Sequence, residues 1–212
     1  MARCPLGNRM SRTFSESGTS SDWEPQRRIV EAAQSGDLEA LASLYDTHIN
    51  QVYRYCLARL GNVHDAEDVA EEIFIKMLNG LPNYQWRKVP FAAWLMRISH
   101  NEVITFTRRN GRRSQDTELP EDLLDQGMQN DPAENAERQL ALEDLRKAVE
   151  LLPEAQREVI ILRFASGLSI ADTARALGKQ ENNVKVLQHK GMQRLQTLMT
   201  PKYPELAQRQ DR

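Results

Sequence analysis

The chain has 212 residues, of which 40% are apolar and 6% are aromatic, with ten glycines and nine prolines. This length fits one large domain or two small ones, and the composition favours a helix-rich globular protein over a β-sandwich. The formal net charge of −2 excludes a general affinity for nucleic acid based on overall charge.

Cysteine usage and hydropathy predict the compartment. Cys4 lies in a polar tail and Cys56 in a helical pattern, so the two cysteines indicate no disulfide framework. No apolar run approaches the ~20 residues that span a membrane, and no apolar core follows the basic residues at the N-terminus, as a secretory signal would require. We therefore expect a reduced, cytoplasmic protein with no membrane contact.

The N-terminal half predicts a disordered tail and then three helices. Residues 1–23 are rich in Ser, Thr, Gly and Arg and hold few large apolar groups to bury. From residue 24 onward helical spacing begins, and Asp37 is a candidate N-cap. Apolar residues then recur at three- and four-residue steps, at Leu41, Tyr45, Ile49, Val52, Cys56 and Leu60.

A second helix in this half carries Ala66, Val69, Ile73 and Met77 on one stripe and ends at Gly80. Residues 79–90 contain two prolines and predict a loop. The third helix runs from Phe91 to about Arg109. We take 24–113 as the first domain.

The C-terminal half predicts a linker and a second helical domain. Residues 114–136 are acidic, contain no Lys or Arg and include Pro120, Gly127 and Pro132, which is typical of a flexible linker. Helical periodicity resumes in 137–200, and 201–212 form a tail. Val159, Ile160, Ile161, Leu162 and Phe164 are apolar nearly all round their helix, which predicts that they are buried. The predicted fold is all-α, with two small helical domains joined by a flexible acidic linker.

The end of the second domain has the pattern of a helix-turn-helix. Ser169 and Asp172 form a capping box, Gly178 is a candidate C-cap, and a longer basic helix follows. In this motif the second helix enters the major groove of DNA. Candidate contacts are Asn182, Asn183, Lys185, Gln188, His189 and Lys190. The alternative is a solvated helix face on a plain four-helix bundle, which periodicity alone does not exclude.

Acidic and basic residues lie in different segments of the first domain. Its second helix holds Asp65, Glu67, Asp68, Glu71 and Glu72, which suits a basic protein partner. Residues 86–113 hold seven Lys or Arg against Glu102, interleaved with aromatic rings. Rings and cations together suit single-stranded DNA. The alternative is that Phe91 and Trp94 are plain core, whereas we expect Tyr84 and Trp86 in the loop to be exposed.

Three stretches together resemble the extracytoplasmic-function (ECF) group of the bacterial sigma-70 family of RNA polymerase sigma factors. They read LYDTHINQVYRYCLARLGNVHDAEDVAEEIFIKML (44–78), PFAAWLMRISHNEVITFTRR (90–109) and LPEAQREVIILRFASGLSIADTARALGKQENNVKVLQHKGMQRL (152–195). The resemblance covers about 25–113 and 137–199 in the order of the family. It implies that 24–113 is sigma domain 2, a helical bundle, and that 137–200 is sigma domain 4, a helix-turn-helix.

The resemblance also implies roles for particular residues. The clamp of the largest polymerase subunit would bind the acidic helix, through Asp65, Asp68, Glu71, Glu72 and Phe74. The −10 promoter element would be bound and melted by Asn83, Tyr84, Trp86, Arg87, Lys88, Trp94, Arg97, Asn101, Arg108, Arg109, Arg112 and Arg113. The −35 element would be read by Asn182, Asn183, Lys185, Val186, Leu187, His189 and Lys190.

Further partners follow from the same resemblance. The second domain would meet the flap region of polymerase, an anti-sigma factor would be a regulatory partner, and the free chain would be a monomer. Three positions depart from the family pattern, and one is Lys179, where the family has an apolar residue. Gln180 is a weak N-cap where the family has Ser, and Leu187 stands where Arg is common, so that Leu187 either contacts a thymine methyl group or packs inward.

We thus expect a promoter-specificity subunit that is not an enzyme and needs no cofactor or metal. A stand-alone helix-turn-helix regulator is the first alternative, but such a protein has no need of the acidic helix. An enzyme is the second, but His48, His64, His100 and His189 lie in separate helices and form no HExxH or Walker pattern.

Overall fold

The computed structural model describes residues 23–86, 89–110 and 132–204, and all regular elements in these ranges are helical. The first unit consists of α1 (Trp23–Gln34), α2 (Leu38–Leu60), α3 (Val63–Gly80) and α4 (Phe91–Asn110). The second consists of α5 (Pro132–Glu150), α6 (Glu154–Ile160), α7 (Ile170–Leu177) and α8 (Glu181–Met199). The all-α prediction with two helical domains is confirmed. The predicted tail up to residue 22 and the linker up to residue 131 lie outside the described residues.

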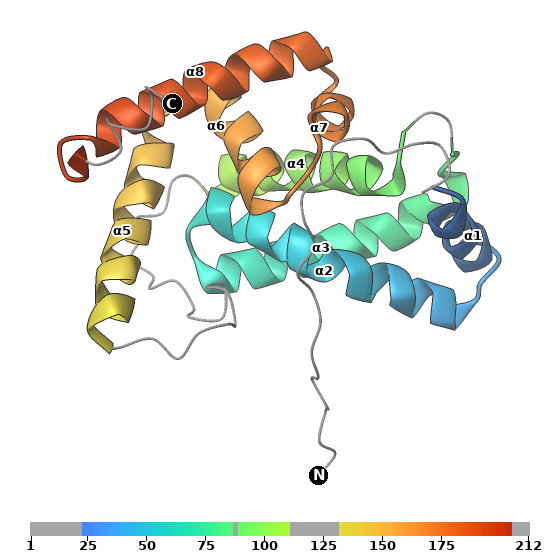
Figure 1. Cartoon of the computed structure of the whole chain (residues 1–212). Helices are drawn as coiled ribbons and strands as arrows, with labels where there is room; N and C mark the ends of the chain where they lie inside the picture. Colours follow the sequence, from blue (N-terminus) through green and yellow to red (C-terminus); the bar gives the residue numbers. More distant parts are fainter. Residues whose placement is uncertain (1–22, 87–88, 111–131, 205–212) are drawn as a thin grey trace.

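The second unit lies over the first, as Figure 1 shows. Helices α6 and α7 face α2 and α4, whereas α8 crosses the top and α5 stands at one end. Among the described residues, no helix has an apolar stretch long enough to cross a membrane.

Local signals set several helix ends where the sequence predicts them. The carboxylate of Asp37 accepts hydrogen bonds from the backbone N–H of Glu39 at 2.9 Å and of Ala40 at 3.2 Å, and so begins α2. The hydroxyl of Ser169 accepts from the N–H of Asp172 at 3.0 Å and begins α7. Gly178 ends α7 with φ +63°, a left-handed conformation that favours glycine.

Other helix bounds differ from the prediction. Asn79 and Gly80 complete α3, and Leu81–Asn83 form a 3-10 turn, so the irregular loop begins only at Tyr84. Helix α5 begins at Pro132, inside the predicted linker, because proline is favoured in the first helical turn, where its missing N–H leaves no bond unmade.

The predicted burial of Phe164 is wrong. Helix α6 passes directly into a π-helical stretch, Ile161–Ala165. A π-helix has more residues per turn than an α-helix, so it rotates the following side chains relative to an α-helical pattern. Ile161 and Leu162 are buried, but Phe164 is 57% exposed.

One apolar core joins the two units. The buried cluster of α1–α4 includes Val52, Tyr55 and Leu95, and it continues into Ile161, Leu162, Leu168 and Ala176 of the second unit. Two smaller clusters lie within the second unit, one around Leu152 and Leu195 and the other around Val159 and Val184. The two units are therefore packed together through one continuous apolar core.

Candidate functional site

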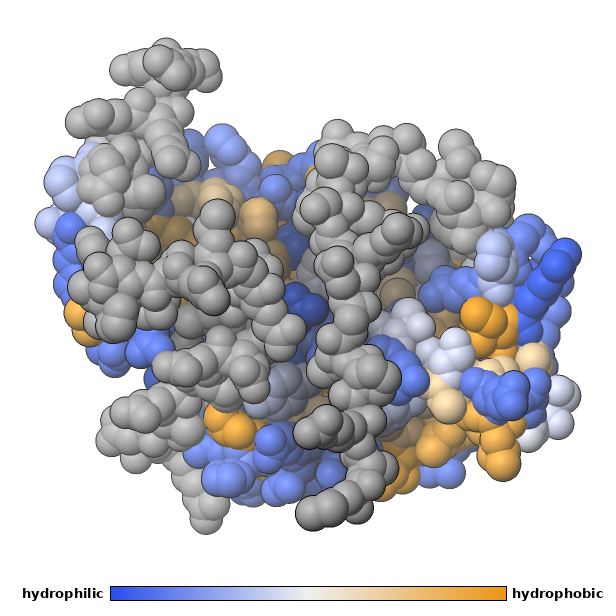
Figure 2. Space-filling view, turned by 60° about the horizontal axis from the view of Figure 1, so that its bottom comes forward, coloured by the Kyte–Doolittle hydropathy of each residue, from blue (hydrophilic) through white to orange (hydrophobic). Residues whose placement is uncertain are grey.

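Helix α3 presents acidic and apolar side chains on the same exposed face. Asp68, Glu71 and Glu72 are exposed, and their spacing of three and four residues places them together. Ile75 and Leu78 continue this face, at 52% and 47% exposure, beside Tyr45 of α2 at 45%. We call these six residues the α3 surface. Figure 2 shows hydrophobic residues exposed among hydrophilic ones at its right, the side where α1 and the neighbouring ends of α2 and α3 lie in Figure 1.

Sequence reasoning missed half of the α3 surface. Tyr45 and Leu78 lie in or beside the apolar stripes of their helices and carry no signal of exposure. Ile75 lies off the stripe of α3, at the spacing of Glu71 and Glu72, and this spacing could have marked it as exposed.

In contrast, the expected contact residue Phe74 is buried at 5% exposure, with its ring centroid 4.7 Å from that of Tyr45. Phe74 therefore supports Tyr45 from behind, and Asp65 is only partly exposed at the start of α3. An exposed apolar patch with an acidic rim is typical of a surface that binds a protein partner.

The loop after α3 is held against α1. The Gln34 side-chain amide donates to the carbonyl oxygens of Leu81 at 2.8 Å and Tyr84 at 2.7 Å. Beside this contact lies a cavity of about 310 Å³, lined by Arg27, Val30, Glu31, Gln34, Tyr84, Gln85 and Trp86. Cavities of this volume are at the lower end of those that take small ligands.

The expected exposure of Tyr84 is wrong. Its side chain is buried, its hydroxyl donates to the carbonyl oxygen of Val89 at 2.8 Å, and burial raises its pKa to about 12. The ring centroid of Tyr84 lies 4.8 Å from that of Trp94 and 5.7 Å from that of Phe91. The loop thus carries its own small aromatic core, which Trp86 joins at an edge while remaining partly exposed.

The other residues expected at the −10 element have varied positions. Asn83, Asn101, Arg108 and Arg109 are exposed, and Trp94 is partly buried against the core. Arg97 is exposed, but its guanidinium donates to the carbonyl oxygens of Arg175 and Ala176 at the end of α7. Arg87, Lys88, Arg112 and Arg113 lie outside the described residues.

Helix α8 has one buried apolar side and one exposed polar side. Val184 and Leu195 are buried, and Leu187 packs against the same cluster as Val184. Leu187 is thus partly buried against this cluster, which favours the inward of the two positions that the sequence left open. Of the residues expected to read the −35 element, those exposed are Asn182, Asn183, Lys185, Val186, His189 and Lys190.

The turn between α7 and α8 lacks the usual cap. Gln180 occupies the N-cap position of α8 in an extended conformation, and its side chain makes no capping hydrogen bond. The backbone N–H groups at the start of α8 are thus left for other partners. Phosphate oxygens are suitable partners, because a helix N-terminus carries a partial positive charge.

Comparison with known proteins identifies the family. Residues 44–113 match the family model of sigma-70 region 2, and residues 142–195 match that of sigma-70 region 4. The ECF RNA polymerase sigma factor SigD of Mycobacterium bovis is 36% identical over 173 residues, which cover 79% of this chain and 80% of SigD. The chain belongs to the ECF group of sigma-70 family sigma factors.

Two further proteins agree with this assignment. The ECF RNA polymerase sigma factor BldN of Streptomyces coelicolor is 33% identical over 180 residues, which cover 84% of this chain and 67% of BldN. Among solved structures, the sigma factor RpoE in complex with the anti-sigma factor NepR from Bartonella quintana has a TM-score of 0.60 at 23% identity, covering 75% of this chain and 96% of RpoE. The solved structure supports the sigma-factor fold of this ECF chain.

Proposed function

We propose that this ECF sigma factor binds core RNA polymerase through the α3 surface and reads a promoter through α4 and α8. The observation that carries the proposal is the separation of two unlike surfaces on one chain. An apolar face with an acidic rim suits a protein partner, and a cationic helix face suits DNA. A stand-alone regulator would use the second surface alone, and the family assignment does not favour it.

The α3 surface supports polymerase docking by its composition. Ile75, Leu78 and Tyr45 supply apolar contact area that is already exposed, so docking requires no unfolding. Asp68, Glu71 and Glu72 surround it with negative charge, which would orient a basic partner surface. The apolar residues would contribute most of the affinity, and the acids would contribute orientation and association rate.

The α8 face supports reading of the −35 element. Lys185 and His189 are four residues apart on the exposed side, and Asn182 and Asn183 lie at the N-terminal end, which contacts base edges in helix-turn-helix proteins. Asparagine pairs with adenine and lysine with guanine or phosphate. Leu187 packs inward, so we leave it out of the reading face.

The α4 helix and its preceding loop support capture of the −10 element. The cavity beside Gln34, Tyr84 and Trp86 offers an aromatic-edged recess for an unstacked base. Because Tyr84 is buried, Trp86 is the better candidate for stacking on DNA. Asn101, Arg108 and Arg109 are exposed along α4 and would contact the strand.

Two regulatory and chemical features complete the proposal. We infer that an anti-sigma factor binds this chain, as NepR binds the sigma factor RpoE in the solved complex. We assign no catalytic step to the chain, because RNA synthesis belongs to the polymerase. Among the described residues, no three His, Cys, Asp or Glu side chains lie close enough to hold a metal ion.

The test is a gel-shift experiment on promoter fragments selected by the holoenzyme. The isolated chain should bind them weakly, because phosphate contacts dominate affinity and the chain has a net charge of −2. Core polymerase should make binding specific. Tight, sequence-specific shifts by the chain alone would instead support the stand-alone regulator.

A further inference from the structure

The side chain of Gln34 ties α1 to the loop that follows α3. Its amide nitrogen donates to the carbonyl oxygen of Leu81 at 2.8 Å and to that of Tyr84 at 2.7 Å. A side-chain amide nitrogen carries two hydrogens, so both are used on the loop. The N–H of Tyr84 donates to the same Leu81 carbonyl at 3.0 Å and closes the turn between them. Gln34 therefore holds both ends of one turn from a different helix.

This contact fixes the position of the aromatic rings in the loop. Gln34 holds the backbone of Tyr84, while Phe91 and Trp94 pack against its ring. The ring centroid of Trp86 lies 6.1 Å from that of Tyr84, with the two planes at 88°. Trp86 is the residue that the proposed function assigns to stacking on a base. Its position depends on Tyr84, and so on Gln34.

One face of α1 forms a wall of the cavity beside this loop. Arg27, Val30, Glu31 and Gln34 all line this cavity of about 310 Å³. Their spacing of three and four residues places them on one face of the helix. Figure 1 shows α1 beside the end of α3 from which the loop starts. The remaining lining residues belong to the loop, so a base stacked on a loop ring would turn its polar edge toward α1.

An ion pair supplies charge on the α1 wall. Arg27 Nε donates to Oε1 of Glu31 at 2.8 Å, and the two side chains are 49% and 54% exposed. This bond uses one carboxylate oxygen, so the second oxygen can accept a hydrogen bond from a ligand. Because both hydrogens of Gln34 are used on the loop, its side chain can offer a ligand its oxygen. The wall thus offers acceptors from Glu31 and Gln34 and donors from Arg27.

Acceptors at this position favour a base that carries an amino group. Adenine, cytosine and guanine each have an exocyclic amino group, whereas thymine presents carbonyl oxygens instead. A carboxylate accepts a hydrogen bond from an amino group and is repelled by a carbonyl oxygen. The cavity should therefore take adenine, cytosine or guanine in preference to thymine.

We propose that α1 is part of the −10 site of this sigma factor. Gln34 is a positioning residue that holds the loop and its aromatic rings in place for a base. Glu31 is a specificity-determining residue that selects a base with an amino group. This inference rests on the proposed function, in which the cavity receives an unstacked base, and it adds the elements that build the recess and choose its occupant.

The experiment measures how the holoenzyme, full-length chain with core polymerase, binds a single-stranded oligonucleotide. The probe has the non-template −10 sequence of a promoter that the holoenzyme transcribes. Gln34→Leu should weaken its binding about tenfold, as expected for the loss of two hydrogen bonds. Gln34→Lys keeps a donor for both carbonyls and should stay within about threefold of wild type. Ser35→Ala removes a donor that bonds within this part of the chain, to Ala32, and is the control.

A second set of oligonucleotides tests base selection. Each −10 position carries adenine, cytosine, guanine or thymine in turn. At one position the wild-type holoenzyme should bind the thymine probe about tenfold more weakly than the best of the others, as for one well-placed polar contact to a base. Glu31→Gln replaces the carboxylate by an amide that both donates and accepts, and should remove most of this difference. Glu24→Gln makes the same change on α1 outside the cavity lining and should preserve it.

Affinity for core polymerase and the melting temperature are measured for each variant. A merely structural role of Gln34 would lower these together with oligonucleotide binding, whereas a positioning role leaves core affinity as in wild type. If Gln34→Leu does not fold, Glu31→Gln at its exposed position still decides. The inference is overturned if folded Gln34→Leu binds the probe as wild type does, or if Glu31→Gln leaves base discrimination unchanged at every position. If the wild-type holoenzyme binds no −10 probe at all, the proposed function itself fails, which is a different result.

Discussion

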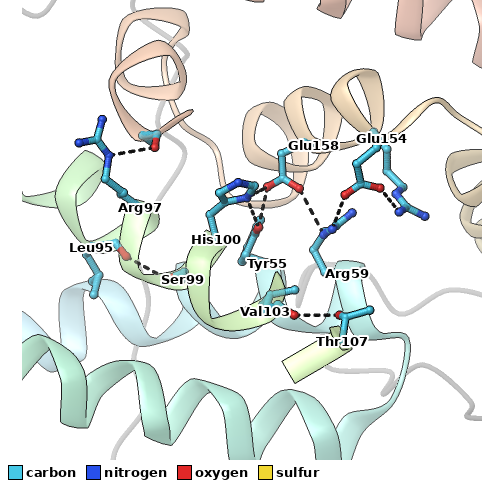
Figure 3. Close-up of polar contacts among 12 residues, drawn as sticks. Tyr55, Arg59, Leu95, Arg97, Ser99, His100, Val103, Thr107, Glu154 and Glu158 are labelled. Carbon is cyan, nitrogen blue, oxygen red and sulfur yellow. Dashed lines mark hydrogen bonds and ion pairs between the residues drawn. The ribbon is translucent and has the colours of Figure 1, made fainter. Parts of the chain in front are cut away.

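Arg59 of α2 and Glu158 of α6 form an ion pair across the boundary between the two helical units (Figure 3), with Nε and Oε2 3.3 Å apart and both side chains at most 5% exposed. Burial raises the pKa of Glu158, but the hydrogen bond from His100 and the charge of Arg59 outweigh it, so the pKa lies below its ordinary value of 4.5. The carboxylate is therefore ionised at neutral pH, and acid should weaken the boundary.

The first prediction concerns pH. Because the pKa of Glu158 is lowered on folding, its contribution to stability is fully present above pH 4.5 and is lost as pH falls through the lower folded value. Of the facing groups, Tyr55 stays neutral because burial raises its pKa further above 10. Burial lowers the pKa of Arg59, but Glu158, Tyr55 and Glu154 together outweigh it, so this pKa is raised and Arg59 stays charged. His100 also faces the carboxylate, and Glu154, whose pKa is lowered as well, titrates in the same direction.

Urea unfolding at a series of pH values measures this contribution. The free energy difference between wild type and Glu158→Gln should be largest near neutral pH and should narrow below about pH 4.5. Glu154 titrates in both chains, so its effect cancels in the difference. If the difference in unfolding free energy between the two chains stays constant down to pH 3.5, the Glu158 carboxylate has no stabilising partner.

The second prediction concerns polymerase binding. Ile75 is 52% exposed in the middle of the α3 surface, so Ile75→Arg places a charge on the proposed apolar contact. Affinity for core polymerase should fall tenfold or more, about 1.4 kcal/mol, as for a central interface residue. Asn50→Arg, which introduces the same charged side chain at an exposed position of α2, is the control. Equal affinities of the two variants in a fluorescence-anisotropy titration would place the docking surface elsewhere.

The third prediction concerns promoter reading. Lys185 is exposed on α8, so Lys185→Ala should lower transcription from a dependent promoter while the melting temperature stays nearly unchanged, because surface substitutions are usually within about 0.5 kcal/mol. Arg194→Ala is the matched control: it removes one positive charge from the same helix nine residues later, beyond the N-terminal part that contacts bases. An unaltered transcript level for Lys185→Ala would mean that another face of α8 meets the DNA.

The fourth prediction concerns packing within the second unit. Gly191 of α8 is buried, and a Cβ atom there would lie 2.9 Å from Cγ1 of Ile160. Alanine is a better helix former than glycine by about 1 kcal/mol, but overpacking costs about 1–3 kcal/mol. Gly191→Ala should therefore leave the chain less stable, as measured by chemical denaturation. Gln193→Ala, exposed on the same helix, should change little, and a stabilised Gly191→Ala chain would mean that α6 and α8 are less closely packed.

Helix positions and caps were predictable from the sequence because they depend on neighbours. Asp37, Ser169 and Gly178 act on backbone groups within a few residues, and each stands at the predicted helix end. The burial of Tyr84 was not predictable in this way. It depends on Gln34, 50 residues earlier, and on packing against Phe91 and Trp94.

The boundary between the units was the least predictable part. Tyr55 and Glu158 are 103 residues apart and meet only after folding, so neither periodicity nor spacing connects them. The exposure of Phe164 depends on a π-helical stretch that an α-helical pattern cannot anticipate. The exposure of Lys185 and His189 on α8 was predictable, since a helix with one apolar side leaves its polar side to solvent, but the contact of Arg97 with the end of α7 was not.

The central claim is that this chain gives core RNA polymerase its promoter specificity. The direct measurement is run-off transcription by core polymerase on a genomic fragment library, with and without the purified chain. We predict transcripts that require the chain, start at fixed sites and share two upstream sequence blocks. Identical transcripts with and without the chain, together with no complex between chain and core enzyme in size-exclusion chromatography, would contradict the account.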